Sequence, residues 1–418
     1  MKRLFSILLL IVMCISFSAP TYADDFNDAR FEFATEFLTR FYRYAYLCEV
    51  SDFSDYIKSD NFLAYINAYS ESEYNKRVIS NGASKALDVE YELLETHNLN
   101  GCVKFELISK LYFTYETYGN KDATEHGIMW RGSEIIVSGT ESFEILDWYC
   151  EFNDYSIRSA PADPAFWENE AAAEEVLTLL KERTDAWISA HERYNTLTPD
   201  SFRNSDSSSA EAEIYSRSDS ATSIQPRVIW PLNKTAMVSW AKRNALASSL
   251  QSGNPSIIPS YYDYSNINGN FDCTNFASHA ILAGGAPMYN NGDRSSGWYY
   301  VDALTGNYSH SWSGVPKLRE FLIYSTGHGP HGREIGYSPI VNGNYTYVAG
   351  DLIQYKNSSG KWSHTAIITG FRQESSTTAI PLVTYRSSPT SRDVDVEYDY
   401  YPGVTEYRII LLDGYYPN

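Results

Sequence analysis

One cysteine in the chain stands in a setting that suits chemistry better than packing. The stretch GNFDCTNFASHAILAGG, residues 269–285, places Cys273 at the start of a predicted helix, with small residues behind it. Asp272, Thr274 and Asn275 surround it with polar side chains, which a cysteine in an apolar core does not need. Cysteine attacks a carbonyl carbon as the thiolate, and a helix N-terminus lowers the pKa of a thiol. We interpret Cys273 as a candidate nucleophile; a buried structural cysteine is the alternative.

A nucleophilic thiol needs a base to take its proton, and His364 is the best placed of the eight histidines. The apolar segment HTAIITG begins at His364, directly after the polar turn KNSSGKWS, where packing does not require a histidine. His279 lies on the far side of the helix that carries the cysteine. His310, in a polar loop, is a weaker alternative, and His328 and His331 in GHGPHG indicate a solvated turn. For His364 itself, the alternative is an ordinary surface histidine.

The first 23 residues predict export of the protein. They read MKRLFSILLLIVMCISFSAPTYA, with a basic start, a short apolar run and small residues near Ala23. This pattern is typical of a secretory signal peptide, and the apolar run is too short to span a membrane. We see no second apolar run of spanning length. We therefore expect residues 1–23 to be removed and the remaining chain to be secreted, without membrane attachment.

The charge of the chain argues against two classes of partner. The 418 residues carry a formal charge of −19, and the loss of residues 1–23 removes Lys2 and Arg3 and no acid, which makes it −21. So acidic a chain is a poor candidate for binding nucleic acid or an anionic membrane surface. The simplest explanation of the acidity is solubility outside the cell. The sequence gives no indication of an oligomeric state.

Four cysteines remain after the predicted cleavage, at positions 48, 102, 150 and 273. They are too few for a scaffold built from disulfides at this length, and none is spaced as CxxC. No metal site and no cofactor is therefore predicted. Cys102 and Cys150 lie on predicted strands and could pair, whereas Cys273 is expected to stay a free thiol.

The sequence pattern divides the mature chain into two parts. Residues 24–200 predict an α+β domain of unknown role, because apolar residues recur every four positions over 26–47 and strand-like alternation follows. A further helix is predicted over 166–194. Residues 201–228 are rich in serine and poor in large apolar residues, which indicates a linker.

Residues 229–418 place helices first and antiparallel strands last, with the cysteine on a helix and the histidine on a strand. That is the layout of a papain-like cysteine hydrolase, preceded here by the separate α+β domain. The pair of motifs DCTNFASHAILAGG and GDLIQY…WSHTAIITG resembles the amidase domain of secreted bacterial proteins. That domain is a distant relative of the NlpC/P60 and CHAP cysteine amidases and peptidases.

The resemblance implies roles for individual residues. Cys273 takes the role of the nucleophile and His364 that of the general base, while Asp272 fixes the turn that presents the thiol and Asn275 supports it. Relatives carry a third polar residue on the next strand to orient the imidazole. Here LVTYRSSPTSRD offers no histidine, and the role stays open between Ser387, Thr384 and Asp393.

The tyrosines at positions 261, 262 and 264 are candidates for a side chain that binds the oxyanion. Trp298 and Trp312 are expected to line the substrate groove, with core packing as the alternative for each.

Two functions are compatible with these residues. The first is a secreted cysteine amidase or peptidase that hydrolyses amide bonds through an acyl-enzyme, for which the resemblance implies cell-wall peptidoglycan or a peptide as substrate. The second is a secreted binding or adhesion module on an inactive amidase scaffold, which the missing third residue supports. The reactivity of Cys273 distinguishes them.

Overall fold

The fold mixes helices with antiparallel sheet, an α+β protein as predicted. It is seen in a computed structural model of the chain. The structure describes thirteen ranges of residues, namely 29–79, 86–117, 120–150, 162–196, 229–247, 272–302, 305–325, 328–337, 340–341, 346–373, 378–388, 391–401 and 403–417. The predicted signal peptide 1–23 and the predicted linker 201–228 lie outside these ranges.

The described helices include those predicted over 26–47, over 166–194 and from Cys273, and also one that begins at His310, where the sequence indicated a polar loop. They comprise α2 (Ala29–Leu47), α3 (Asp60–Ile79), η1 (Pro164–Glu168), α5 (Glu170–Thr196), α7 (Lys234–Ala245), α8 (Cys273–Ala283), α9 (His310–Ser313), α10 (Val315–Tyr324) and η4 (Tyr398–Tyr400).

The strands are β1 (Ala86–Leu99), β2 (Cys102–Thr117), β3 (Asn120–Ser138), β4 (Glu144–Cys150), β5 (Tyr300–Asp302), β6 (Asn307–Tyr308), β7 (Gly329–Gly336), β8 (Ile340–Val341), β9 (Leu352–Asn357), β10 (Trp362–Gln373), β11 (Thr378–Ser388), β12 (Ser391–Glu397) and β13 (Val404–Tyr416).

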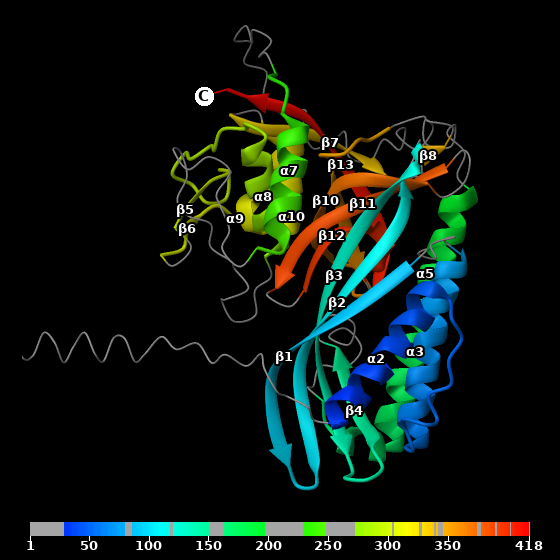
Figure 1. The fold of residues 1–418 in the computed structure, drawn as a ribbon. Helices are drawn as coiled ribbons and strands as arrows, with labels where there is room; N and C mark the ends of the chain where they lie inside the picture. The colour runs from blue at the N-terminus through cyan, green and yellow to red at the C-terminus, as the bar shows by residue number, and fades with distance from the viewer. Residues whose placement is uncertain are drawn as a thin grey trace, which may run out of the picture.

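One sheet runs through both halves of the chain. Its path through the described strands is β1-β2-β3-β12-β11-β10-β9-β13-β7, with β4 paired to β3 and β8 to β11. The junction is the antiparallel pairing of β3 with β12, in which Met129 lies opposite Asp393 and Arg131 opposite Ser391. Figure 1 shows the long strands β1 to β3 continuing into the strands of the C-terminal half. The expectation that residues 24–200 form a separate domain is corrected accordingly. Strands that come before the predicted linker and strands that come after it belong to one continuous hydrogen-bonded sheet.

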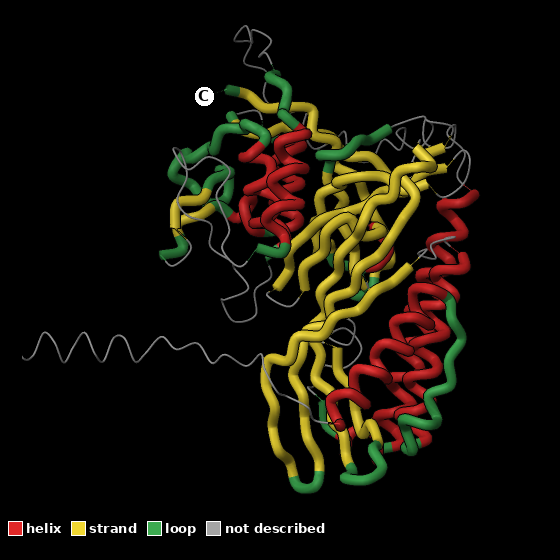
Figure 2. The backbone as a smooth tube through the Cα atoms, in the orientation of Figure 1, coloured by secondary structure: helices red, strands yellow, loops and turns green. Residues whose placement is uncertain are grey.

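Two hydrophobic cores lie on opposite faces of this sheet. On β9 and β13, neighbouring residues alternate between them: Ile353 and Ile409 belong to one core, Leu352 and Ile410 to the other. The larger core contains the apolar faces of α2, α3 and α5 together with strands from both halves of the chain. The smaller contains α7, α8 and α10. Figure 2 shows these two groups of helices on the two sides of the strands.

Five of the described strands were not predicted from the sequence: the short strands β5, β6 and β8, and the longer strands β7 and β12. β7 contains His331, in the GHGPHG stretch interpreted as a solvated turn, and pairs with β13. β12 pairs with β11 on one side and β3 on the other. β7 is rich in glycine and charged residues and lacks the apolar alternation that identifies a strand, while in β12 the alternation is limited to Val394 and Val396 among charged residues.

The four described cysteines form no disulfide with one another, as expected for Cys273. The pairing of Cys102 with Cys150, left open by the sequence, does not occur. Cys102 lies opposite Ser138 on one side of β3, and Cys150 lies opposite Ser133 on the other side. Five positions along β3 plus two strand spacings put their Cα atoms beyond the limit of about 7 Å for a disulfide.

The described helices also bear on membrane attachment: among them, none combines the length and the apolar character needed to cross a bilayer.

The shared sheet predicts that the two halves stay together when the chain is cut. We expect a protein with an inserted protease site in residues 201–228 to remain one complex after cleavage, because the β3–β12 ladder and the larger core join the halves. Size-exclusion chromatography and native mass spectrometry before and after cleavage measure this, with the uncut sample as control. A folded 229–418 fragment eluting alone would contradict the prediction.

Candidate active site

The start of α8 is tied to β11. The backbone N–H of Asp272 donates to the carbonyl of Ser387 over 2.9 Å. The Asp272 carboxylate accepts from Asn275 Nδ2 at 2.9 Å and lies 3.9 Å from Arg386 Nε. All four residues are buried. Asp272 thus joins the turn before Cys273 both to the neighbouring strand and to the first turn of the helix.

The Cys273 thiol lies in this buried junction, and its side chain is only 3% exposed. Its Sγ is 3.8 Å from Thr274 Oγ1 and faces the backbone N–H groups of Thr274 and Thr365. Burial raises the pKa of the thiol above its ordinary value, and the negative charge of Asp272 adds to this. The N–H groups and the threonine hydroxyl offset the rise in part. The thiol is therefore protonated at neutral pH.

The His364 imidazole is enclosed by hydroxyl and aromatic groups. The Ser387 hydroxyl lies 3.3 Å from Nδ1, and the Tyr401 ring stacks on the imidazole with centroids 4.0 Å apart. Tyr385 meets it edge-on at 4.4 Å. His364 is 1% exposed, and Nε2 has no hydrogen-bond partner among the described residues. Burial, together with the positive charge of Arg131, lowers the pKa of His364 well below its ordinary value.

The cysteine and the histidine belong to one site without a direct hydrogen bond between them in the described part of the chain. Thr365, the residue after His364, turns its N–H to the sulfur, and Ser387 bonds both the backbone before Cys273 and the imidazole. The opposite pKa shifts give a neutral thiol beside a neutral imidazole. The helix start does not produce the resting thiolate expected from the sequence, because desolvation outweighs the effect of the helix N-terminus.

Of the three residues that could orient the imidazole, Ser387 is the one that faces it. Thr384 Oγ1 instead lies 2.9 Å from Thr369 Oγ1. Asp393 is held in a buried ion pair with Arg131 at 2.8 Å. A hydroxyl holds the imidazole less firmly than a buried carboxylate does, because it carries no charge.

The two tryptophans expected in a groove lie in the core. Trp298 and Trp312 are both 0% exposed and belong to the smaller core. Trp312 Nε1 donates to Asn275 Oδ1 at 2.6 Å, and Trp298 Nε1 donates to Ser278 Oγ at 3.2 Å. They pack beneath α8 and satisfy its polar side chains. The expectation that they line the groove is therefore wrong, because both pack in the core. Asn275 connects Trp312 to Asp272, since its side chain bonds both.

Other sequence candidates do not enter the site. His279 packs between aromatic rings, with its ring centroid 5.0 Å from that of Trp312 and 6.0 Å from that of Trp240. Burial lowers its pKa to about 3. His310 is exposed at the start of α9. The three tyrosines proposed for the oxyanion, at 261, 262 and 264, lie outside the described residues.

Sequence reasoning missed the aromatic and charged groups around His364. Tyr401 follows η4, Tyr385 lies on β11, and Arg131 comes from β3 in the other half of the chain. With 35 tyrosines in the sequence, no spacing marks these two. Arg131 enters only through the unpredicted β3–β12 pairing, so no local signal identifies it.

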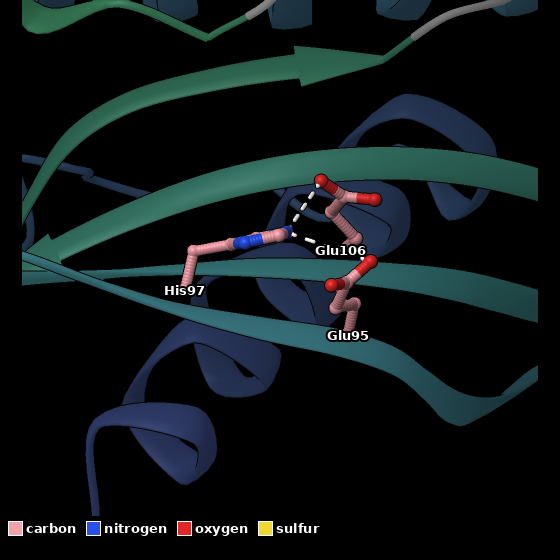
Figure 3. A group of neighbouring side chains, drawn as sticks. All are labelled: Glu95, His97 and Glu106. Carbon is pink, nitrogen blue, oxygen red and sulfur yellow. Dashed lines mark hydrogen bonds and ion pairs between the residues drawn. The ribbon is translucent and has the colours of Figure 1, made fainter.

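A second group of ionisable side chains lies on the β1–β2 hairpin, far from this site (Figure 3). His97 Nε2 is 2.9 Å from Glu106 Oε1 and 3.7 Å from Glu95 Oε2, and these ligand atoms are close enough together to hold a metal ion. However, Lys104 Nζ already lies 2.9 Å from the same Glu106 oxygen and, as the largest influence, lowers the pKa of that carboxyl. The group therefore has its own cation, as cross-strand ion pairs commonly do.

Comparison with known proteins covers mainly the C-terminal half. Residues 231–409 match the family model described as "Putative amidase domain", which includes both Cys273 and His364. This supports assigning that part of the chain to the amidase-domain family and suggests amide hydrolysis. A Bacillus subtilis (strain 168) protein named "Uncharacterized protein YhbB" is 30% identical over 112 residues, which are 26% of this chain and 31% of that protein. The chain thus spans about a third of that relative. No solved structure matches.

The neutral thiol predicts how Cys273 reacts with iodoacetamide. Because its pKa lies above the ordinary value, we expect the alkylation rate to rise about tenfold per pH unit from about pH 6 to about pH 8. Mass spectrometry of the Cys273 peptide gives the rate, with the Cys102 peptide as an internal control. A rate that is constant over this range would indicate a thiolate–imidazolium pair and contradict the prediction.

Proposed function

We propose that the protein is a secreted cysteine amidase or peptidase that hydrolyses amide bonds through an acyl-enzyme on a papain-like domain. One observation carries the proposal. In the part of the chain that matches the amidase family, a helix-borne Cys273 and a strand-borne His364 are joined through Thr365 and Ser387 in one buried site.

The neutral pair defines the first step. As the sulfur attacks the amide carbon, the thiol proton passes to His364, which acts as general base. The carbonyl oxygen becomes an oxyanion, and the N–H of Cys273, in the first turn of α8, is available to stabilise it. The imidazolium then gives its proton to the leaving nitrogen, the C–N bond breaks, and a thioester remains on Cys273.

Water completes the reaction. His364 takes a proton from the water as its oxygen attacks the thioester carbon. The C–S bond breaks, the proton returns to the sulfur, and a carboxylic acid leaves. The Ser387 hydroxyl at Nδ1 holds the ring through both steps.

Tyr401 controls access in this proposal. Its ring stacks on the His364 imidazole. The pKa of the Tyr401 hydroxyl is raised first by burial and second by the nearby Cys273. Tyr401 is half-buried and belongs to the short connection between η4 and β13. A substrate carbonyl approaching the sulfur displaces this ring.

The substrate class and the location extend the proposal. The motif resemblance favours peptidoglycan stem peptides or other peptides as substrates, and the signal-like N-terminus favours action outside the cell. The charge of −21 disfavours attraction to an anionic cell wall, so a secreted enzyme acting away from the wall fits equally well.

An inactive binding module on the same scaffold is the second candidate. The observation in its favour is the buried, protonated thiol, which has no hydrogen bond to His364 among the described residues. The two candidates differ in whether Cys273 forms an acyl-enzyme.

Replacement of the nucleophile tests the proposed function. We expect Cys273→Ala to fold normally and to lose hydrolysis completely, because no other described thiol reaches His364. The measurement is mass spectrometry of products from purified peptidoglycan and from a peptide library. Cys102→Ala, which removes a thiol at the start of β2, is the matched control and keeps activity. Hydrolysis by Cys273→Ala would refute the cysteine mechanism.

Removal of the Tyr401 ring tests access to the thiol. We expect Tyr401→Ala to raise the rate of Cys273 alkylation by about tenfold at constant pH, which corresponds to about 1.4 kcal/mol of lost covering contact. Tyr401→Phe keeps the ring and serves as the control, with an unchanged rate. Equal rates for Tyr401→Ala and the unaltered protein would show that Tyr401 does not cover the site.

A further inference from the structure

An arginine from the N-terminal half lies behind the candidate base. Arg131 is on β3, outside the 231–409 segment that matches the amidase family, yet it is only 1% exposed. A guanidinium remains charged in a protein and is rarely buried without a carboxylate partner. Its position therefore requires an explanation.

The partner of Arg131 is Asp393 on β12, which is also fully buried. Two nitrogens of the guanidinium donate to the two carboxylate oxygens, at 2.8 and 3.1 Å. The β3–β12 register places Arg131 opposite Ser391, so its side chain reaches Asp393 along the same face of the sheet. This two-point geometry fixes both side chains relative to the strands.

Tyr385 connects this ion pair to the site. In the β11–β12 register, Tyr385 lies directly opposite Asp393. Its pKa is raised by burial and by Asp393 and lowered by Arg131, so its hydroxyl end lies beside the pair. Its ring contacts the His364 imidazole in a T-shaped arrangement, with ring centroids 4.4 Å apart. The contacts thus run from Arg131 through Asp393 and Tyr385 to His364.

We propose that Arg131 is a positioning residue for the His364 imidazole, holding Asp393 and through it the Tyr385 ring against the base. The proposal rests on the proposed function, since it assigns to the N-terminal half a part in the same site. The amidase-like segment by itself lacks this group. In this proposal the N-terminal half therefore contributes a residue that the site requires.

The charge of Arg131 also acts on His364 directly. Burial is the largest cause of the lowered pKa of the imidazole, and the charge of Arg131 is the second. The neutral state of the base in the resting site therefore depends in part on a residue of the other half. The ionisable groups that contact the His364 ring are Tyr355, Tyr385 and Tyr401, and Arg131 acts on it through its charge. Behind them, Asp393 is paired with Arg131 and Cys273 lies near Tyr401.

The test is the titration of His364 in the full chain, followed by NMR of isotope-labelled histidine and assigned with His364→Gln. In the unaltered protein His364 stays neutral at pH 6. In Arg131→Met we expect its pKa to rise by about one unit or more, because a nearby positive charge is lost. In Asp393→Asn, which leaves Arg131 uncompensated, we expect no rise. A purely structural role would make the two variants behave alike.

Arg392→Met is the matched control. Arg392 lies on the same pair of strands but on the other face, over the ring of Trp130 at 5.4 Å. We expect no shift of the His364 pKa in this variant. If Arg131→Met does not fold, the double variant Arg131→Met/Asp393→Leu replaces the buried pair by apolar side chains, a change that proteins often tolerate. It is expected to raise the pKa as well.

Unchanged His364 titration in Arg131→Met or the double variant, or an equal rise in Asp393→Asn or Arg392→Met, would overturn the proposal. Arg131→Lys separates charge from geometry: we expect His364 to stay neutral while hydrolysis slows, because the two-point contact is lost. The titration needs no substrate. A failure of the proposed function, seen as hydrolysis by Cys273→Ala, is therefore distinguishable from a failure of this inference.

Discussion

The site depends on the hydrogen bonds that the start of α8 forms with both β10 and β11. The N–H of Asp272 bonds the Ser387 carbonyl, and the N–H of Thr365 faces the sulfur. A helix start held by these hydrogen bonds directs the Cys273 thiol at the edge of a strand and not into solvent. The position of the sulfur is therefore set by main-chain hydrogen bonds, which are less easily disturbed than contacts between mobile side chains.

The burial of the helix start affects the charge state of Cys273. The helix N-terminus and the strand N–H groups favour a thiolate, whereas removal from water disfavours it. In the resting protein desolvation prevails, and both Cys273 and His364 are neutral. In the proposed reaction, the two groups become charged only when the thiol proton passes to the imidazole. The protein thus keeps this thiol in its less oxidisable form, since oxidation follows thiolate character and exposure.

The sequence predicted those parts of the site that are local along the chain. The start of α8 at Cys273 follows from polar residues before a run of small ones, and the strand of His364 follows from apolar residues after a turn. The polar environment of Cys273 favours a functional cysteine, which stays a prediction. It did not predict the pKa direction, because burial depends on segments that pack from elsewhere.

The rest of the site comes from contacts between distant segments. No pattern in β3 or β12 indicates that the two strands pair, because each has alternatives of similar length and alternation. The face to which an aromatic residue turns is equally hidden: Trp298 and Trp312 look alike whether they line a groove or pack under a helix. Their hydrogen bonds to α8 decide between these possibilities, and such bonds appear only in the folded protein.

The pairing of β3 with β12 also constrains the order in which the protein folds. Arg131 and Asp393 are 262 positions apart in the chain. On this side of β3, β4 pairs with Ser133–Ser138, whereas the part from Ile128 to Arg131 has no neighbour until almost the whole polypeptide is present. Contacts of such long range close late, because the loop entropy must be overcome first. Until then this part of β3 exposes an unpaired edge, the kind that invites pairing with other chains. The β3–β12 ladder is therefore expected to be among the last elements to form.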